Sequence, residues 1–472
     1  MMEFNDQIKR IKDKLPKAKK ADRNLEVFGA KSHKYQLNDP ATKEEVSAFE
    51  QKYGIELPAC YKAFILQVGN GGIAYEGAAA GPFYGIYPLG KHVDELIYSD
   101  ARECLKAGCR VYPEMPDEYW RALNENIDDD SDISDEDYEL ELGKIFGGIL
   151  PIGSQGCSYL HGIVVNGPYR GRVVNICADR QKPQFTFEAN FLDWYERWLD
   201  EVISGELVGE SPRWFGYVMG GSDIALSHAL VDAGTIQQRS DCLDGILNKK
   251  KVKEETIQII EEQLLQDPGE LKIKLLQVLT KFDYKRAKPH LIELSKTDLL
   301  PVFQFVYWYA KDKSGEWLPL IAEHIGSIDN DETFTYCTYL LRATGTNFGH
   351  LLVPFTESDN ESIRATAFYT LGKVKNKKDL METFIKGLSD HSTRVIVYTL
   401  QALIDVKDTR LLPHYKQVAE RFPEEKDYVL SNLNQRLADY GLSNETILSR
   451  NEAGTKGRRT TGGGRKWYHL WR

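Results

Sequence analysis

The chain has 472 residues, more than one hydrophobic core usually fills, so we expect two domains or one domain followed by a repeat array. Its hydrophobic fraction of 42% and charged fraction of 28% are those of an ordinary globular protein, which excludes disorder of the whole chain. The net charge of −10 argues against a protein that coats nucleic acid over its whole surface.

The sequence contains no membrane or export signal that we recognise. No run of about 18 apolar residues occurs, and the polar, basic N-terminus is not followed by the apolar segment of a secretory signal. The 7 cysteines are scattered and form no C-x-x-C pair. We therefore predict a cytoplasmic protein with reduced thiols.

The first elements are predicted to be helices. Residues 1–24 form a basic amphipathic pattern with apolar residues every three to four positions. Thr42 and Glu45 are spaced as a capping box, which predicts a helix over 43–53 that ends at Gly54. Pro58 can open the next helix, because the amide it lacks would have no partner there.

Strands are expected in the middle of the first half. Phe83–Tyr87 reads as a strand, and weaker helix patterns cover 91–107 and 115–125. Three Ile- and Val-rich runs, 145–153, 159–166 and 171–178, predict an antiparallel meander. A last helix carries Trp194 and Trp198 at helical spacing, which we interpret as core residues. Helices, then strands, then a helix predict an α+β domain over 25–210.

The second half repeats itself. Residues 359–374 match the segment that begins 32 residues later, so that Ile363 aligns with Val395 and Leu371 with Leu403. A second match, at an offset of 124, aligns 276–290 with 400–414. Because single helical pairs cannot bury their apolar faces, repeats of this kind stack. We predict an all-α, HEAT-like solenoid over 237–440, although the period is shorter than is usual for HEAT repeats.

Several motifs of the first half occur in an order that points to a family. They are Phe28-Gly-Ala-Lys-Ser-His33, Leu57-Pro58-x-x-Tyr61-Lys-x-Phe64, Val68-Gly-Asn-Gly-Gly72, Ala80-Gly-Pro-Phe-Tyr-Gly-Ile-Tyr-Pro-Leu89, Leu150-Pro-Ile-Gly-Ser-Gln-Gly-Cys157, Gly171-Arg-Val-Val174 and Phe191-Leu-Asp-Trp194. Together they resemble the SUKH superfamily, which includes bacterial immunity proteins and a fungal regulator of cell-wall synthesis.

The resemblance implies a SUKH-like fold and a non-catalytic role in protein binding. Bacterial members are implied to neutralise toxin domains, often nucleases, and the fungal member is implied to be a signalling scaffold. This chain departs from the family pattern by an insertion at Ile73–Ala79 and by an acidic stretch before the meander.

The acidic stretch, from Glu125 to Glu141, contains no basic residue and is the predicted partner-binding site. Its candidate residues are Asp128, Asp129, Asp130, Asp132, Asp135, Glu136, Asp137 and Glu139. One interpretation is that the stretch imitates a phosphate backbone and enters the basic cleft of a nuclease. The alternative is a solvated loop. A calcium loop is disfavoured, because Ile133 stands where an EF-hand needs glycine.

The tail over 453–472 is basic, aromatic and predicted to be flexible. Its basic and aromatic residues are Lys456, Arg458, Arg459, Arg465, Lys466, Arg472, Trp467, Tyr468 and Trp471. Such a segment could bind nucleic acid by charge and stacking, or could dock on an acidic surface of the same chain.

No sequence motif indicates catalysis, a metal site or a cofactor. The Gly69–Gly72 run lacks the Lys-Ser/Thr of a phosphate loop, and the histidines lack metal-ligand spacing. We therefore expect a non-catalytic immunity protein that occludes a toxin domain, or alternatively an intracellular scaffold or regulator that binds cellular proteins through the solenoid. The oligomeric state and the partner's identity stay open.

Overall fold

The computed structural model describes residues 4–96, 100–127, 132–209, 214–266, 269–422 and 428–449. The chain divides into two compact units, residues 1–282 and 283–472. We describe each unit by itself. Within the described ranges, no helix combines the length and the apolar character needed to cross a membrane.

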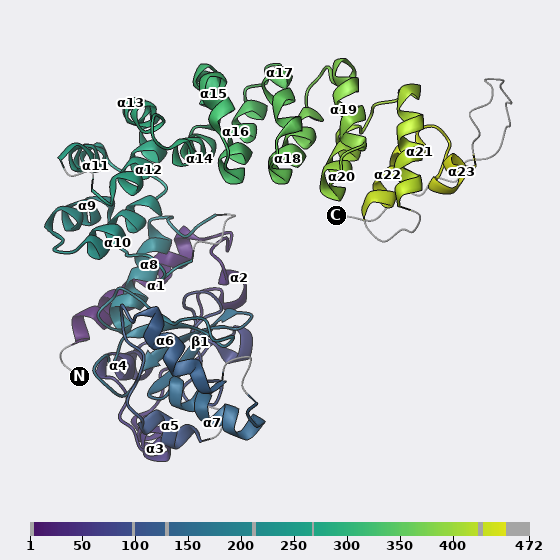
Figure 1. Cartoon of the computed structure of the whole chain (residues 1–472). Helices are drawn as coiled ribbons and strands as arrows, with labels where there is room; N and C mark the ends of the chain where they lie inside the picture. Colours follow the sequence, from purple (N-terminus) through teal and green to yellow (C-terminus); the bar gives the residue numbers. More distant parts are fainter. Residues whose placement is uncertain are drawn as a thin grey trace. The chain divides into compact units, whose positions relative to one another are not determined.

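Unit 1 contains a small sheet among helices, followed by further helices (Figure 1). Its helices are α1 (Asn5–Ala21), α2 (Ala30–His33), α3 (Lys43–Tyr53), α4 (Ala59–Gln67), α5 (Ala101–Lys106), α6 (Asp117–Asn124), α7 (Asp135–Ile145), α8 (Phe191–Ile203), α9 (Asp223–Asp232), α10 (Ile236–Leu247), α11 (Glu254–Gln266) and α12 (Lys272–Phe282). The predicted α3 is confirmed with its capping box, because Thr42 accepts from the Glu45 amide and Glu45 accepts from the Thr42 amide.

The sheet of unit 1 is antiparallel. Its strands are β1 (Ile149–Gly156), β2 (Tyr159–Val164), β3 (Val173–Cys177) and β4 (Gln184–Phe185). In the described part of the chain they form one sheet of order β1-β2-β3-β4. The predicted meander is thus confirmed, and β3 is buried along its whole length. Because these strands are buried, their sequences are rich in Ile and Val, and this composition is what allowed the strands to be predicted.

The predicted strand at Phe83–Tyr87 is wrong. Only an isolated bridge between Ala79 and Ile86 forms there. Phe83 and Gly85 both have positive φ angles, of 54° and 100°, which interrupt an extended backbone. The segment nevertheless lies along β1, because the Tyr84 amide donates to Ser154 O and the Tyr87 amide donates to Ile152 O.

Aromatic side chains of α8 form the centre of the core. Trp194 and Trp198 are 0% and 1% exposed, which confirms their interpretation as core residues. Tyr195 packs edge-on against Phe64 of α4 at 4.7 Å and donates its hydroxyl to Ala80 O. Burial of each such side chain contributes on the order of 1.5–3 kcal/mol to stability. This core fixes the positions of the loops that surround the sheet.

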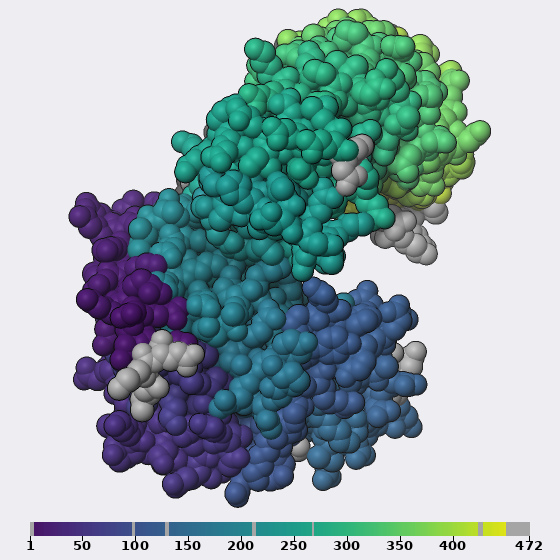
Figure 2. Space-filling model, turned by 90° about the vertical axis from the view of Figure 1, so that its left-hand side faces the viewer, coloured from purple at the N-terminus to yellow at the C-terminus, as the bar shows by residue number. Residues whose placement is uncertain are grey.

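Helix α1 packs against α8 at the surface of unit 1, where it is drawn in purple (Figure 2). Ile8 and Ile11 supply the buried face. Arg10 and Lys14 pair with Glu196 of α8, each with its nitrogen 2.8 Å from Glu196 Oε1. The basic residues of this predicted N-terminal helix are therefore partly neutralised within the unit.

The described residues of unit 2 contain helices and connecting loops but no strand. Its α-helices are α13 (Tyr284–Leu294), α14 (Leu299–Tyr309), α15 (Leu318–His324), α16 (Asp331–Ala343), α17 (Gly349–Leu352), α18 (Glu361–Leu371), α19 (Met381–Leu388), α20 (Thr393–Ala402), α21 (Leu412–Arg421), α22 (Tyr428–Ala438) and α23 (Asn444–Leu448).

Alternate helices of unit 2 pack on one another in sequence. Helix α14 contacts α16, which contacts α18, which contacts α20, which contacts α22. In Figure 1 these helices follow one side of the array, and α13, α15, α17 and α19 follow the other. The five contacting helices begin 30 to 35 residues apart, in agreement with the offset of 32 read from the sequence. They are called the inner helices below.

Candidate functional site

The described part of the acidic stretch lies at and before the start of α7. Asp132, Asp135, Glu136, Asp137 and Glu139 are all exposed. Asp128, Asp129 and Asp130 lie outside the described residues. Ser134 caps α7 by accepting from the Asp137 amide at 3.2 Å. Carboxylates in a first helical turn are stabilised by the helix dipole, so Asp135, Glu136 and Asp137 have a local structural role, and the cluster presents its negative charge to solvent.

An exposed aromatic patch lies on the same unit. It consists of exposed Phe28 and Trp214 together with Tyr84 and Tyr159, which are half-buried. Phe28 is 41% exposed and Trp214 is 53% exposed. The ring centroid of buried Phe83 lies 5.7 Å from that of Phe28 and 6.0 Å from that of Trp214, and Trp214 in turn lies 6.4 Å from Tyr159. Single exposed apolar side chains are common, whereas contiguous ones mark interaction surfaces.

The segment that carries Trp214 is fixed to the domain. Phe215 is buried, and its ring contacts Trp194 at 5.9 Å. Asn175 donates to Gly216 O, and the Tyr217 hydroxyl donates to Gln155 Oε1 at 2.9 Å. The described backbone that follows Trp214 is therefore anchored while the indole is exposed, a state that lowers the entropy cost of binding a partner.

The end of β1, which lies against Tyr84 of the aromatic patch, requires a glycine at position 156. A Cβ atom at Gly156 would lie 2.9 Å from the Tyr84 ring, and its φ of +100° already disfavours other residues. Gly156 ends β1, and exposed Cys157 follows it in the turn to β2. The hairpin tip can therefore lie directly against Tyr84.

The loop after β3 connects the aromatic patch to α7. Tyr159 of the patch donates its hydroxyl to Gln181 Oε1 at 2.9 Å. The neighbouring Arg180 lies over the ring of Tyr138 in α7, at 5.9 Å, and donates to Ile127 O. An apolar centre with charged residues beside it is the usual anatomy of a protein–protein interface.

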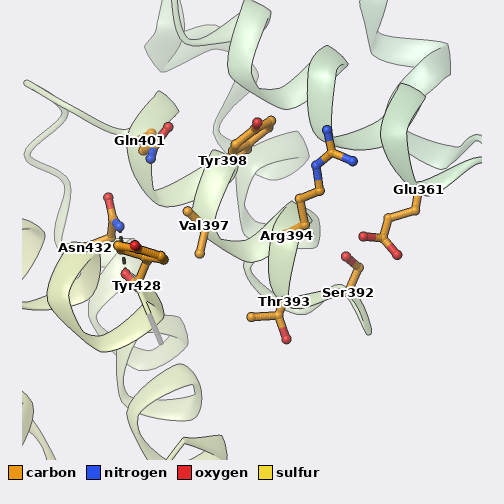
Figure 3. Close-up of a pocket in the computed structure, with 9 residues that line it drawn as sticks. All are labelled: Glu361, Ser392, Thr393, Arg394, Val397, Tyr398, Gln401, Tyr428 and Asn432. Atoms are coloured by element: carbon orange, nitrogen blue, oxygen red, sulfur yellow. Dashed lines mark hydrogen bonds between the residues drawn. The ribbon is translucent and has the colours of Figure 1, made fainter. Parts of the chain in front are cut away.

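Unit 2 contains a second candidate site, a shallow pocket of about 630 Å³ between α20 and α22 (Figure 3). Arg394, Val397, Tyr398 and Gln401 of α20 line it, together with Tyr428 and Asn432 of α22. Glu361 at the start of α18 forms its edge. We call it the α20–α22 pocket. Tyr428 is 81% exposed, although tyrosines usually bury most of their ring.

Tyrosines recur along the inner helices that lead to this pocket. They are Tyr307, Tyr336, Tyr339, Tyr369, Tyr398 and Tyr428. The rings of Tyr307 and Tyr339 are 5.1 Å apart, and those of Tyr369 and Tyr398 are 5.6 Å apart. Lys311, Lys373 and Arg394 lie over individual rings of the series. We call this series the tyrosine row.

Two histidines of unit 1 are buried. Burial lowers the pKa of His33 to about 4 and that of His161 to about 3, so both imidazoles are neutral at physiological pH. His161 lies beside Gln155 and Asn175 and against the Trp194 ring, which are core contacts. Within the described ranges no group of His, Cys, Asp and Glu is arranged to hold a metal ion.

The comparison with family models covers this unit. Residues 40–197 match the model of the SMI1 / KNR4 family (SUKH-1). The match supports a SUKH domain here. No curated protein matches the chain. The matched range contains the sheet, α7 and the first part of α8, whereas Phe28 and Trp214 of the aromatic patch lie on either side of it.

Sequence reasoning found the acidic stretch but missed both aromatic surfaces. Phe28 and Tyr84 occur in the motifs that resemble the family, yet nothing in those motifs says which rings are exposed. Trp214 follows the predicted domain and has no periodic pattern around it. The tyrosine row had a usable signal, because its spacing of about 30 residues matches the helical repeat.

Proposed function

We propose that this chain is an immunity protein that neutralises a cognate toxin domain by occlusion, through the aromatic patch and α7 of its SUKH domain. The main observation in support is that Trp214 is exposed in an aromatic patch, while the backbone that follows it is anchored. The loop after β3 connects this patch to the acidic start of α7. Tryptophan and tyrosine are the residues that most often supply the binding energy of an interface.

The acidic residues fit a basic partner such as the substrate cleft of a nuclease. Exposed carboxylates accelerate the capture of a basic protein more than they tighten the final complex. In this proposal the aromatic patch supplies most of the affinity, and Asp128–Glu139 supply the association rate and the selectivity. The protein acts in the cytoplasm and needs no catalysis.

The second candidate is an intracellular scaffold or regulator, related to cell-wall synthesis or signalling, that uses unit 2 as a HEAT-like solenoid. The stacking of the inner helices and the regular tyrosine row support this alternative. Repeat arrays present extended surfaces of this kind to partner proteins.

The test is capture of the tagged full chain from its native cells at moderate and at high salt. Immunity predicts one toxin-like domain at one-to-one stoichiometry. Trp214→Ala should weaken its binding by about 30-fold or more, the effect of losing a hot spot of about 2 kcal/mol. Trp308→Ala removes a side chain that is 45% exposed in unit 2 and is the matched control.

The acidic contribution is tested with Glu136→Gln plus Glu139→Gln. This pair should slow association several-fold at low salt, by an effect that salt suppresses. Glu262→Gln plus Glu323→Gln removes the same charge from exposed helical sites elsewhere and should change nothing. A mixed set of captured proteins, or binding that survives Trp214→Ala, would refute the immunity proposal and leave the scaffold as the better explanation.

A further inference from the structure

We propose that the α20–α22 pocket is the docking site of the chain's own tail, residues 453–472, through the aromatic and basic side chains around Trp467. This inference concerns unit 2 alone and does not depend on the function proposed for the SUKH domain.

The first argument is the exposed aromatic surface at the pocket. Tyr428 is 81% exposed at the start of α22, and Tyr398 contributes its ring from α20 (Figure 3). The aliphatic side chain of Val397 and the amides of Gln401 and Asn432 also line the pocket. An indole that enters such a pocket gains ring contacts and has amide groups within reach of its N–H.

The second argument is where the chain leaves the described residues. Helix α23 contacts α21 and α22. The side-chain amide of Asn444, at the start of α23, donates to Leu430 O at 3.1 Å, two residues from Tyr428. The Asn444 backbone amide donates to Asn434 Oδ1 at 2.8 Å. The segment that precedes the tail is thus bound to the helix that supplies one wall of the pocket.

The tail is long enough for Trp467 to reach the α20–α22 pocket. Trp467 follows Ser449, the last described residue, by 18 positions, which is up to about 60 Å of extended chain. Packed helices are about 10 Å apart, so the whole α18–α22 surface is within range. A tether of this kind supplies an effective concentration in the range of about 1 mM, at which even a weak contact is occupied.

The third argument is chemical complementarity. The tail has six basic residues, three large aromatic residues and no acid. The pocket has exposed Glu361 at its edge, and Asp331 and Glu332 are exposed at the start of α16, the preceding inner helix. Arg394 already donates to Ser362 Oγ and covers the Tyr398 ring, whereas the ring of Tyr428 has no cation over it within the described residues. Tyr428 can therefore accept a tail arginine by a cation–π contact.

Hydrogen exchange of the full chain, read by mass spectrometry, tests the docking directly. Amides of residues 465–472 should exchange about tenfold more slowly than an unprotected peptide, since docked amides exchange only from the open state. Tyr428→Ala should accelerate that exchange about fivefold or more. This variant leaves the fold intact, because the side chain is mostly exposed. Tyr75→Ala, which removes a ring that is 61% exposed in unit 1, is the matched control.

A second measurement reads the site in trans. The full chain with Trp467→Ala and Trp471→Ala should bind a synthetic peptide of residues 456–472, and the same chain with Tyr428→Ala added should bind it at least tenfold more weakly. Tail amides that exchange at the unprotected rate in the parent would overturn the proposal, as would protection that survives Tyr428→Ala. Protection that rises with protein concentration would also overturn it, in favour of a second copy as the occupant.

Discussion

Glu196 of α8 is the residue at which the basic α1 is tied to the SUKH domain. Burial alone would raise its pKa, but hydrogen bonds from Arg10 and Lys14 outweigh this and lower the pKa to about 2. The two cations approach Glu196 Oε1 at 2.8 Å each, and Gln7 donates to Oε2 at 3.1 Å. Two of the cations of α1, Arg10 and Lys14, are thus paired inside unit 1.

We predict that Glu196→Gln lowers the free energy of unfolding of unit 1 at pH 7 by about 1–2 kcal/mol, less than the full pKa shift would give because solvent screens the pair. The folded-state pKa lies below the unfolded value of about 4.3, so the stabilisation is complete above pH about 4.3 and is lost as the pH falls toward 2. Urea unfolding of parent and variant between pH 7 and pH 3 measures this. A difference that does not shrink on acidification would contradict the assignment.

Predictability at the residue scale follows local chemistry. Thr42 and Glu45, and the tryptophans of α8, were predictable because capping and helical periodicity depend on neighbours in the sequence. Phe83–Tyr87 was mispredicted because the positive φ of Phe83 depends on tertiary packing that β-propensity does not encode. Exposure of Phe28 and Trp214 also depends on tertiary packing, so the centre of the candidate site could not be read from the sequence.

At the scale of elements, two inner helices of unit 2, α18 and α20, are connected through a buried arginine. Arg364 of α18 is 6% exposed and donates to Asp390, in the loop before α20, as well as to the carbonyl oxygens of Ser358 and Asp359. It therefore holds the start of α18 to the loop that begins the next inner helix. The periodicity of 32 residues predicted that these helices stack, but not which side chain connects them.

Arg364→Ala should destabilise unit 2 by about 3 kcal/mol, because the Asp390 carboxylate, whose side chain is 12% exposed, loses its main partner. Arg394→Ala is the matched control in the next inner helix. Arg394 is exposed and makes one hydrogen bond to a side chain of α18, so its loss should cost about 1 kcal/mol or less. Hydrogen exchange of the α18 and α20 amides across a denaturant titration, read by mass spectrometry, reports on this unit. Equal effects of the two substitutions would refute the structural role given to Arg364.

At the scale of the whole molecule, the charge of −10 conceals a segregated distribution. Basic α1 is paired with acidic residues of α8, the start of α7 carries exposed acids, and all charged residues of the tail are basic. The two candidate binding surfaces belong to different units and share no residue. Independent sites without shared partners respond additively to substitution.

We therefore expect the two surfaces to be separable in the full chain. Trp214→Ala should weaken binding of the toxin-like partner by about 30-fold or more and leave hydrogen exchange of residues 465–472 unchanged. Tyr428→Ala should release the tail and leave the partner's dissociation constant within about twofold. The double variant should show both the weaker partner binding and the faster tail exchange, each to the same extent as in the single variants. Partner binding that weakens when the tail is released would show that the tail forms part of the toxin-binding surface, and would contradict the assignment of the tail to an internal contact in unit 2.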